Sequence, residues 1–297
     1  MLSKIERRTS DRWPARMVRI LPLLVCPSCK GGLNESAENF FCSICAREYP
    51  VNSGRIFFIG AAEAEDSLDI IKNRLKNFFG QQYYRKLVSI IGPSYPFDYR
   101  GAISTHLDLS SKIVIDLGSG NNRIDMNVVT LDASDYQAVD IVADVNQLPF
   151  RTSSIDAFCT CSVLEHLPEL DKSLEEISRC TKPLGIGLHQ IPFMYPFHAS
   201  PNDFTRLTHV GAKNLFHGWS MVEQRSVTGP VSLLLTCFVE FLSIVFSLGF
   251  PRLRAILFLF FCTLLFPIKY LDFFFVGRNS FISLAPTILT VLRKPGN

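Results

Sequence analysis

Five short apolar runs between residues 113 and 193 restrict this 297-residue chain to a fold built on a mostly parallel sheet. In chain order the runs read IVID, NVVTLD, VDIVAD, SIDAFCTC and IGLHQIPF. Between the fourth and fifth runs, apolar residues recur at helical spacing at Leu170, Leu174, Ile177 and Cys180. Short apolar strands that alternate with helices are typical of a doubly wound α/β sheet, which binds ligands at the carboxyl ends of its strands.

The first three of these strands end in acidic residues. Asp116 begins an Asp-x-Gly-x-Gly turn with Gly118 and Gly120, and Asp132 and Asp144 end the second and third strands. A glycine-rich turn after a buried strand lets the backbone approach a ligand, and an acid at the next strand end can accept hydrogen bonds from ribose hydroxyls. The turn alone is a weak signal. A nicotinamide enzyme is the alternative, but the chain lacks its Gly-x-Gly-x-x-Gly pattern.

Four cysteines form two close pairs near the N-terminus. Two residues separate the cysteines within each pair, and twelve residues lie between the pairs Cys26/Cys29 and Cys42/Cys45. Two such turns joined by a hairpin place four thiolates around one tetrahedral ion, so we expect a structural zinc site. Disulfides and a rubredoxin-like iron site are the alternatives. We also expect Gly31 and Gly32 to supply the positive φ angles of the first turn.

A long hydrophobic segment interrupts the C-terminal part of the chain. Residues 231–250 contain one charge, Glu240, and after Pro251, Arg252 and Arg254 the sequence stays apolar to residue 268. Twenty helical residues span about 30 Å, the thickness of the hydrocarbon core of a bilayer. The segment is therefore predicted to be a membrane-seeking helical insertion, either re-entrant or spanning as a hairpin; a soluble helical cap is the alternative.

Composition and charge limit the possible functions and locations of the protein. The hydrophobic fraction of 47% is enough for a large core, and the net charge of +3 gives no strong nucleic-acid signal. Six basic residues do cluster in the first nineteen positions, which suits a solvated tail or an anionic membrane surface. No secretory signal is apparent, so we expect a membrane-associated protein whose soluble parts face the cytoplasm. The expected units are a basic segment (1–20), a zinc ribbon (21–60), a helical connector (61–110), an α/β core (111–229), the insertion (230–279) and a last strand (280–297).

Residues 112–230 resemble the class I S-adenosylmethionine-dependent methyltransferases, in the type 11-like subgroup marked here by LPF, VLEHL and RCTKPLG. The resemblance implies a doubly wound, seven-stranded Rossmann-like sheet whose last strand lies antiparallel. It also implies that Asp116, Gly118 and Gly120 surround the methionine part of the cofactor, that Asp132 contacts the ribose and Asp144 the adenine, and that His166 lies nearby. The chain departs from the family at Asn121 and Asn122, and it leaves room for only a short first helix.

The ribbon resembles the small zinc-binding activator of tRNA and protein methyltransferases, through its Cys-Pro-x-Cys start and its Tyr-Pro-Val finish. A polar stretch after the fifth strand resembles the acceptor loop of bacterial methyltransferases with such ribbons. It supplies His198, Asp203 and Arg206 as candidate catalytic residues, with a structural hydrogen bond as the alternative for His198. The resulting hypothesis is methylation of an amphiphilic or lipid-linked acceptor at the membrane. The alternatives are a tRNA or protein methyltransferase and a disabled scaffold protein.

Overall fold

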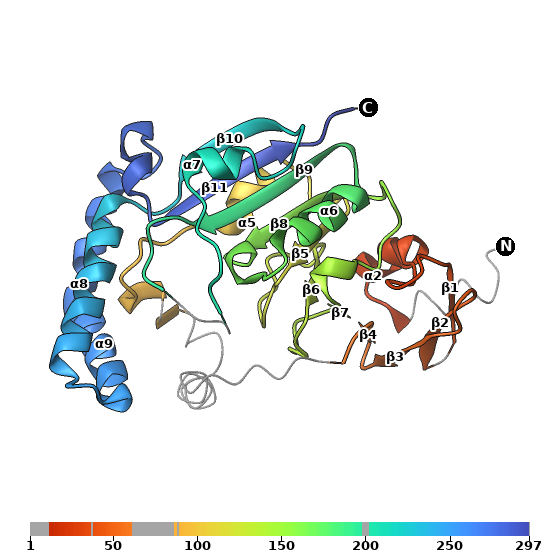
Figure 1. Cartoon of the computed structure of the whole chain (residues 1–297), viewed down its shortest axis with the longest axis horizontal. Coiled ribbons are helices and arrows are strands. Elements are labelled where there is room, and N and C mark those ends of the chain that lie inside the picture. The colour runs from red at the N-terminus through yellow and green to blue at the C-terminus, as the bar shows by residue number, and fades with distance from the viewer. Residues whose placement is uncertain (1–11, 37, 61–85, 88, 198–201, 297) are drawn as a thin grey trace.

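The computed structural model describes residues 12–36, 38–60, 86–87, 89–197 and 202–296. Residues 61–85 and 88 of the predicted helical connector lie outside the described part, as do residues 1–11 of the basic N-terminal segment. In the described part a long sheet crosses the molecule, with the cysteine-rich unit at one end and two apolar helices along one side (Figure 1).

The seven predicted core strands are present in the order β7-β6-β5-β8-β9-β11-β10. They are β5 (Val114–Leu117), β6 (Val129–Asp132), β7 (Ile141–Val142), β8 (Ile155–Cys161), β9 (Thr181–Pro192), β10 (Ser220–Ser226) and β11 (Thr287–Arg293). Strands β5 to β9 run parallel, and β11 lies antiparallel between β9 and β10. The α/β fold class with an antiparallel last strand is therefore confirmed.

Helices cover both faces of this sheet. The predicted amphipathic helix is α6 (Leu170–Cys180), which buries Leu174 and Ile177 against one face. On the other face, α5 (Tyr99–Ser104) buries Ala102 and Ile103 against β5, β8 and β9. Shorter helical elements are η2 (Val145–Gln147), η3 (Leu164–His166) and α7 (His209–Lys213).

The expected short helix after the glycine turn is absent. Residues 118–128, all of which the structure describes, form turns and bends between β5 and β6. Side-chain hydrogen bonds of Asn121 and Arg123 shape this connection instead. The β7–β8 connection is also short and contains only η2. An N-terminal helix, α2 (Ala15–Ile20), which is followed by η1 (Leu21–Leu23), packs beside these strands and buries Met17 and Ile20 in the same core cluster as α6.

The cysteine-rich unit continues the central sheet. Its strands are β1 (Leu33–Glu35), β2 (Asn39–Cys42), β3 (Glu48–Asn52) and β4 (Arg55–Phe57). Ile56 and Phe57 of β4 pair in parallel with Ile141 and Val142 of β7, so that eleven strands form one sheet. In Figure 1 the red and orange ribbon strands extend the edge of the core at β7.

The hydrophobic insertion contains two helices between β10 and β11. They are α8 (Pro230–Phe246) and α9 (Pro251–Leu265), which we call the apolar hairpin, and they are followed by η4 (Phe266–Phe274) and η5 (Asn279–Leu284). Leu235 and Val239 of α8 pack against Cys262 of α9. A tight turn at Gly249, whose φ is +84°, joins the two helices.

Two buried charged residues fix the base of the apolar hairpin. The Asp272 carboxylate accepts hydrogen bonds from the backbone N–H groups of Gly229, Val231 and Ser232, and so it caps the first turn of α8. The Lys269 ammonium donates to the carbonyl oxygens of Ser89 (2.6 Å) and Gly92 (2.9 Å). The base of the insertion is therefore tied to residues 89–92 and to Gly229.

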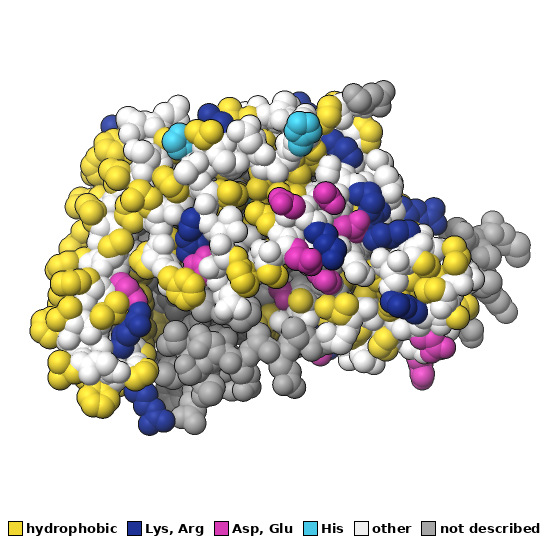
Figure 2. Space-filling view, viewed as in Figure 1, with side chains coloured by type: hydrophobic (Ala, Val, Ile, Leu, Met, Phe, Trp, Pro, Cys, Tyr) yellow, Lys and Arg dark blue, Asp and Glu magenta, His cyan; other side chains and the backbone are white. Residues whose placement is uncertain are grey.

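The outer side of the apolar hairpin is exposed. Leu234, Leu248 and Phe250 expose 70%, 80% and 65% of their surface, and Figure 2 shows hydrophobic side chains along the whole outer edge of the two helices. By length and composition, one described helical segment, Pro251–Phe274, could cross a membrane, with a mean hydropathy of 1.9 and 17% of its most apolar stretch buried. Exposed apolar surface of this kind is typical of interaction sites.

Candidate functional site

The carboxyl ends of β5 and β6 bring Asp116, Gly118, Gly120 and Asp132 together. Gly118 and Gly120 follow β5 with φ angles of +64° and +56°, which favour glycine over any residue with a side chain. A Cβ atom on Gly118 would lie 2.5 Å from a methyl group of Val163, whereas nothing lies within 4 Å of the same position on Gly120. The turn is thus tightly packed at Gly118 and open at Gly120.

Asp116 is buried at the end of β5, with 3% of its surface exposed. Burial, and then the nearby Asp132 carboxylate, raise the pKa of Asp116 to about 8, although the Arg123 charge opposes this shift. The hydroxyl of Tyr99 is also buried, and it has no hydrogen-bond partner among the described residues. Burial, and then the neighbouring Cys159 and Asp116, raise the Tyr99 pKa well above its ordinary value. The two buried polar groups could therefore receive a polar or cationic ligand group.

Asp132 closes the glycine turn from the neighbouring strand. Its Oδ2 accepts from the backbone N–H of Gly120 (2.8 Å), and its Oδ1 accepts from that of Ser134 (2.9 Å). Each carboxylate oxygen retains a lone pair for a ligand. Asp144 lies at the end of the third core strand and caps η2 by accepting from the N–H of Asn146 (2.8 Å).

The turn after β8 holds His166 and a buried residue to which the sequence analysis gave no role, Glu165. The Glu165 side chain is buried, and burial raises its pKa, although the His166 charge opposes the shift. The backbone oxygen of Glu165 accepts from Phe204 N (2.7 Å), and Nδ1 of His166 donates to the Asn202 carbonyl (2.5 Å). The only sequence signal for Glu165 was its position beside His166 at the end of a strand.

These hydrogen bonds bring the candidate acceptor loop to the same edge of the sheet. Asp203 and Arg206 form a two-pronged ion pair, with Nη1 of Arg206 2.5 Å from Oδ1 of Asp203. Arg206 also donates to the carbonyl oxygen of Pro196 (3.5 Å). His198, the third candidate, lies outside the described residues. The described part therefore brings Asp203, Arg206 and His166 together, near the ends of the strands that carry the acidic residues.

The four N-terminal cysteines form one cluster. Their sulfur atoms all lie within 4.8 Å of one another, with Cys26 and Cys45 3.6 Å apart and Cys29 and Cys42 3.3 Å apart. None of them forms a disulfide. Thiolates bound to zinc at about 2.3 Å in a tetrahedron are separated by similar distances, so this donor set fits a four-coordinate ion. The Tyr49 hydroxyl also lies 3.0 Å from the Cys26 sulfur.

The prediction for Gly31 and Gly32 was wrong. The residues with positive φ are Lys30 (58°) and Ala46 (55°), which follow the second cysteine of each pair. Their backbone N–H groups donate to the carbonyl oxygens of Cys26 and Cys42, and these hydrogen bonds hold the left-handed turns. Gly31 is constrained by space instead, because a Cβ atom there would lie 3.0 Å from the Cys42 sulfur.

Comparisons with known proteins agree with this architecture. Residues 97–188 match the family model described as "Methyltransferase domain". No curated protein matches the chain.

Several solved structures with a similar fold are distant in sequence. The complex of the Haloferax volcanii Trm112 methyltransferase activator with its partner matches at 17% identity, over 78% of this chain and all of that chain, with a TM-score of 0.40. The Burkholderia thailandensis 1,6-didemethyltoxoflavin-N1-methyltransferase, solved with S-adenosylhomocysteine, matches at 12% identity over 87% and 100%, with a TM-score of 0.43. An S-adenosylmethionine-dependent methyltransferase from Mesorhizobium loti matches at 13% identity over 65% and 96%, with a TM-score of 0.39.

Similarity at this level says nothing about the acceptor. The family match covers the glycine turn, the three strand-end acids and the turn after β8. Residues 97–188 therefore form a methyltransferase domain.

Proposed function

We propose that this protein transfers a methyl group from S-adenosylmethionine to an amphiphilic or lipid-linked acceptor at a membrane surface. The observation that carries the proposal is the exposed apolar hairpin, which joins the core beside the candidate acceptor loop. The N–H groups of Phe193 and Met194, which begin that loop, donate to the carbonyl oxygens of Pro286 and Ala285, just before β11, where the chain returns from the insertion. A bilayer that received the hairpin would therefore lie close to the acceptor loop.

The cofactor would be held by the strand-end residues. In this proposal Asp116, Gly118 and Gly120 surround its methionine part, with the buried carboxyl of Asp116 facing the ammonium group. Asp132 would accept from the ribose hydroxyls and Asp144 from the adenine amino group, with His166 next to them. The open space at Gly120 and the unpartnered hydroxyl of Tyr99 support this assignment.

Methyl transfer mainly requires alignment and the exclusion of water. The bound cofactor supplies an electrophilic methyl group on a positively charged sulfur atom. We assign His198 to accept a proton from the acceptor, and the Asp203–Arg206 pair to orient the acceptor against the methyl group. Arg206 holds Asp203 through two hydrogen bonds, which favours orientation over proton transfer for that carboxylate.

The ribbon would hold a structural zinc ion through Cys26, Cys29, Cys42 and Cys45. Four thiolates fill a tetrahedral shell and leave no open position for a substrate, so the ion would stabilise the fold only. A unit of four short strands has little hydrophobic core of its own, so a bound zinc ion would supply much of the free energy that stabilises its fold.

Cofactor binding is the first test of this function. Titration of S-adenosylhomocysteine into the detergent-solubilised full chain should give one site per chain by calorimetry. We expect Asp132→Ala to weaken binding at least tenfold, since the variant loses a ligand contact and the hydrogen bond that closes the glycine turn. Asp135→Ala is the matched control, because Asp135 follows the same strand but pairs with Arg55 on the surface. A folded wild-type chain that binds no ligand would support the scaffold alternative.

The acceptor class needs a separate experiment. The enzyme and a cofactor with a labelled methyl group are incubated with either a lipid extract or an aqueous metabolite extract. We expect label to enter the lipid fraction and this transfer to require the intact hairpin. Label confined to aqueous products, tRNA or protein would rule out the lipid-linked acceptor.

A further inference from the structure

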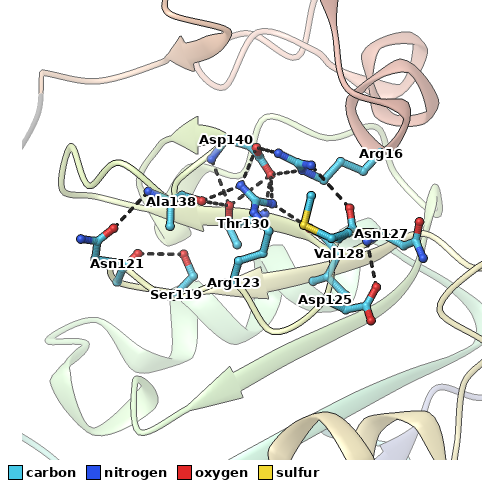
Figure 3. Close-up of polar contacts among 12 residues, drawn as sticks. Arg16, Ser119, Asn121, Arg123, Asp125, Asn127, Val128, Thr130, Ala138 and Asp140 are labelled. Atoms are coloured by element: carbon cyan, nitrogen blue, oxygen red, sulfur yellow. Dashed lines mark hydrogen bonds and ion pairs between the residues drawn. The ribbon is translucent and has the colours of Figure 1, made fainter. Parts of the chain in front are cut away.

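A buried ion cluster connects the N-terminal helix to the cofactor loop. Asp140, just before β7, has 4% of its side chain exposed and receives two-pronged ion pairs from two arginines (Figure 3). Arg16 of α2 donates from Nε to Oδ2 (3.0 Å) and from Nη2 to Oδ1 (2.9 Å). Arg123 donates from Nη1 to Oδ2 (2.8 Å) and from Nη2 to Oδ1 (2.9 Å). The backbone N–H and the hydroxyl of Thr130 complete the set, each 3.1 Å from Oδ2.

Arg123 belongs to the loop that begins with the cofactor glycines, and it shapes that loop. Its guanidinium also donates to the carbonyl oxygens of Val128 (3.1 Å) and Ala138 (2.7 Å). In the same loop, the side-chain oxygen of Asn121 accepts from the N–H of Ala138 (3.2 Å). Figure 3 shows Arg123 reaching from the loop to Asp140 between these contacts. These side-chain hydrogen bonds thus connect the loop to residues 138–140 and hold it in place without a helix.

Arg16 is placed to stabilise this arrangement from outside the methyltransferase domain. Only 11% of its side chain is exposed, and its guanidinium donates to the same two carboxylate oxygens that Arg123 contacts. Its Nη1 also approaches the carbonyl oxygen of Met126 in the loop (3.5 Å). Burial would raise the pKa of Asp140, but the hydrogen bonds from Arg16 and Arg123 outweigh this effect and lower it, so the carboxylate stays ionised.

We propose that Arg16 is a positioning residue for the cofactor: through Asp140 and Arg123, it holds the loop of residues 118–128 in the conformation that binds S-adenosylmethionine. The N-terminal helix that precedes the ribbon then contributes to the cofactor site by positioning its loop. This inference rests on the cofactor site proposed above. It extends that site to a residue about a hundred positions earlier in the chain, in a segment that the family match does not cover.

The test compares two arginines of the same helix. Arg16→Gln removes the charge from the cluster, whereas the matched control Arg19→Gln removes a guanidinium that donates to the carbonyl oxygens of Ser110 and Ser111. Each full-length protein is titrated with S-adenosylhomocysteine by calorimetry. Hydrogen exchange of the loop amides is followed in the absence of ligand, with Gly118 and Gly120 as reporters because their N–H groups are hydrogen-bonded. Arg16→Lys keeps the charge without the two-pronged geometry, and it replaces Arg16→Gln if that variant does not fold.

We expect Arg16→Gln to weaken ligand binding five- to tenfold and to speed hydrogen exchange of the loop amides. Arg16→Lys should give values between those of Arg16→Gln and wild type. Arg19→Gln should match wild type in both measurements. Unchanged affinity and exchange in Arg16→Gln would overturn the proposal. Equal losses in Arg19→Gln would also overturn it, since they would show general damage to the helix. If wild type binds no ligand, the cofactor site itself fails, and exchange alone decides whether Arg16 orders the loop.

Discussion

Asp116 holds a proton at neutral pH in the ligand-free protein, because its pKa of about 8 lies above the solution pH. The ammonium group of the cofactor favours the ionised carboxylate, so binding and ionisation are coupled. Ligand affinity should therefore rise with pH by up to tenfold per unit below pH 8 and level off above it. Near pH 7, binding should release up to one proton per site.

Calorimetry in buffers of different ionisation enthalpy measures this proton release. Asp116→Asn cannot ionise and should bind without a pH-dependent step over the same range. Asp135→Asn, at an exposed ion pair, serves as the control and should behave like wild type. Binding without proton uptake or release by the wild type at pH 7 would contradict the raised pKa.

Single residues also mark the limits of what the sequence could predict. Cysteine spacing was sufficient to predict the four-sulfur cluster, because two short turns can bring thiolates together whatever surrounds them. The backbone angles were not predictable from residue type, since the positive φ falls on Lys30 and Ala46. Tyr99 and Glu165 were missed because their importance comes from burial beside residues distant in the sequence.

At the scale of elements, the ribbon and the core share one hydrophobic cluster. Cys26, Cys42 and Tyr49 of the ribbon belong to the same buried set as Leu117 and Ile141 of the core. We therefore predict that Cys42→Ser abolishes binding of about one zinc ion per chain and also lowers the melting temperature of the methyltransferase core.

Metal analysis and thermal unfolding of the full chain test this prediction. Cys161→Ser is the matched control: Cys161 lies at the end of β8, outside the cluster, and its replacement should leave the zinc content unchanged. Loss of zinc without any change in core stability would mean that the ribbon is an independent unit. Full zinc content in Cys42→Ser would show that the cluster is not the metal site.

Strand positions and the helix α6 were predictable because apolar periodicity reflects burial directly. Two arrangements were not. The pairing of β4 with β7 depends on backbone hydrogen bonds, which leave little trace in the sequence. The connection after the glycine turn looked long enough for a short helix, but the bonds of Arg123 and Asn121 hold it as a loop. Neither could be inferred without knowing which distant segments meet.

At the scale of the whole molecule, the exposed apolar hairpin predicts membrane attachment. Burial of apolar surface stabilises by roughly 25 cal/mol per Å², so the bare hairpin would promote aggregation in water. Both ends of the insertion return to the paired strands β10 and β11, so the chain must enter and leave the bilayer on one side. We expect the full chain to remain with membranes after a carbonate wash.

Replacement of residues 231–268 by a short Gly/Ser linker should release a soluble protein that retains zinc and binds S-adenosylhomocysteine. Recovery of the intact chain as a detergent-free soluble monomer would contradict membrane attachment. A cysteine placed at Leu253, near the turn between the two helices, then reports topology. Labelling from the far side of the membrane indicates a spanning hairpin, and protection indicates a re-entrant or in-plane one.

The pairing of β4 with β7 also has a consequence for the order in which the chain folds during its synthesis. Ile56 leaves the ribosome 85 residues ahead of its partner Ile141, a lead of about 4 to 17 s at 5 to 20 residues per second. During this interval β4 has no partner from the core, and the ribbon must keep it extended. A ribbon that has already folded around its metal ion can hold β4 in place until β7 pairs with it. Without zinc the ribbon would not be folded, and β7 would remain an unpaired, aggregation-prone edge strand.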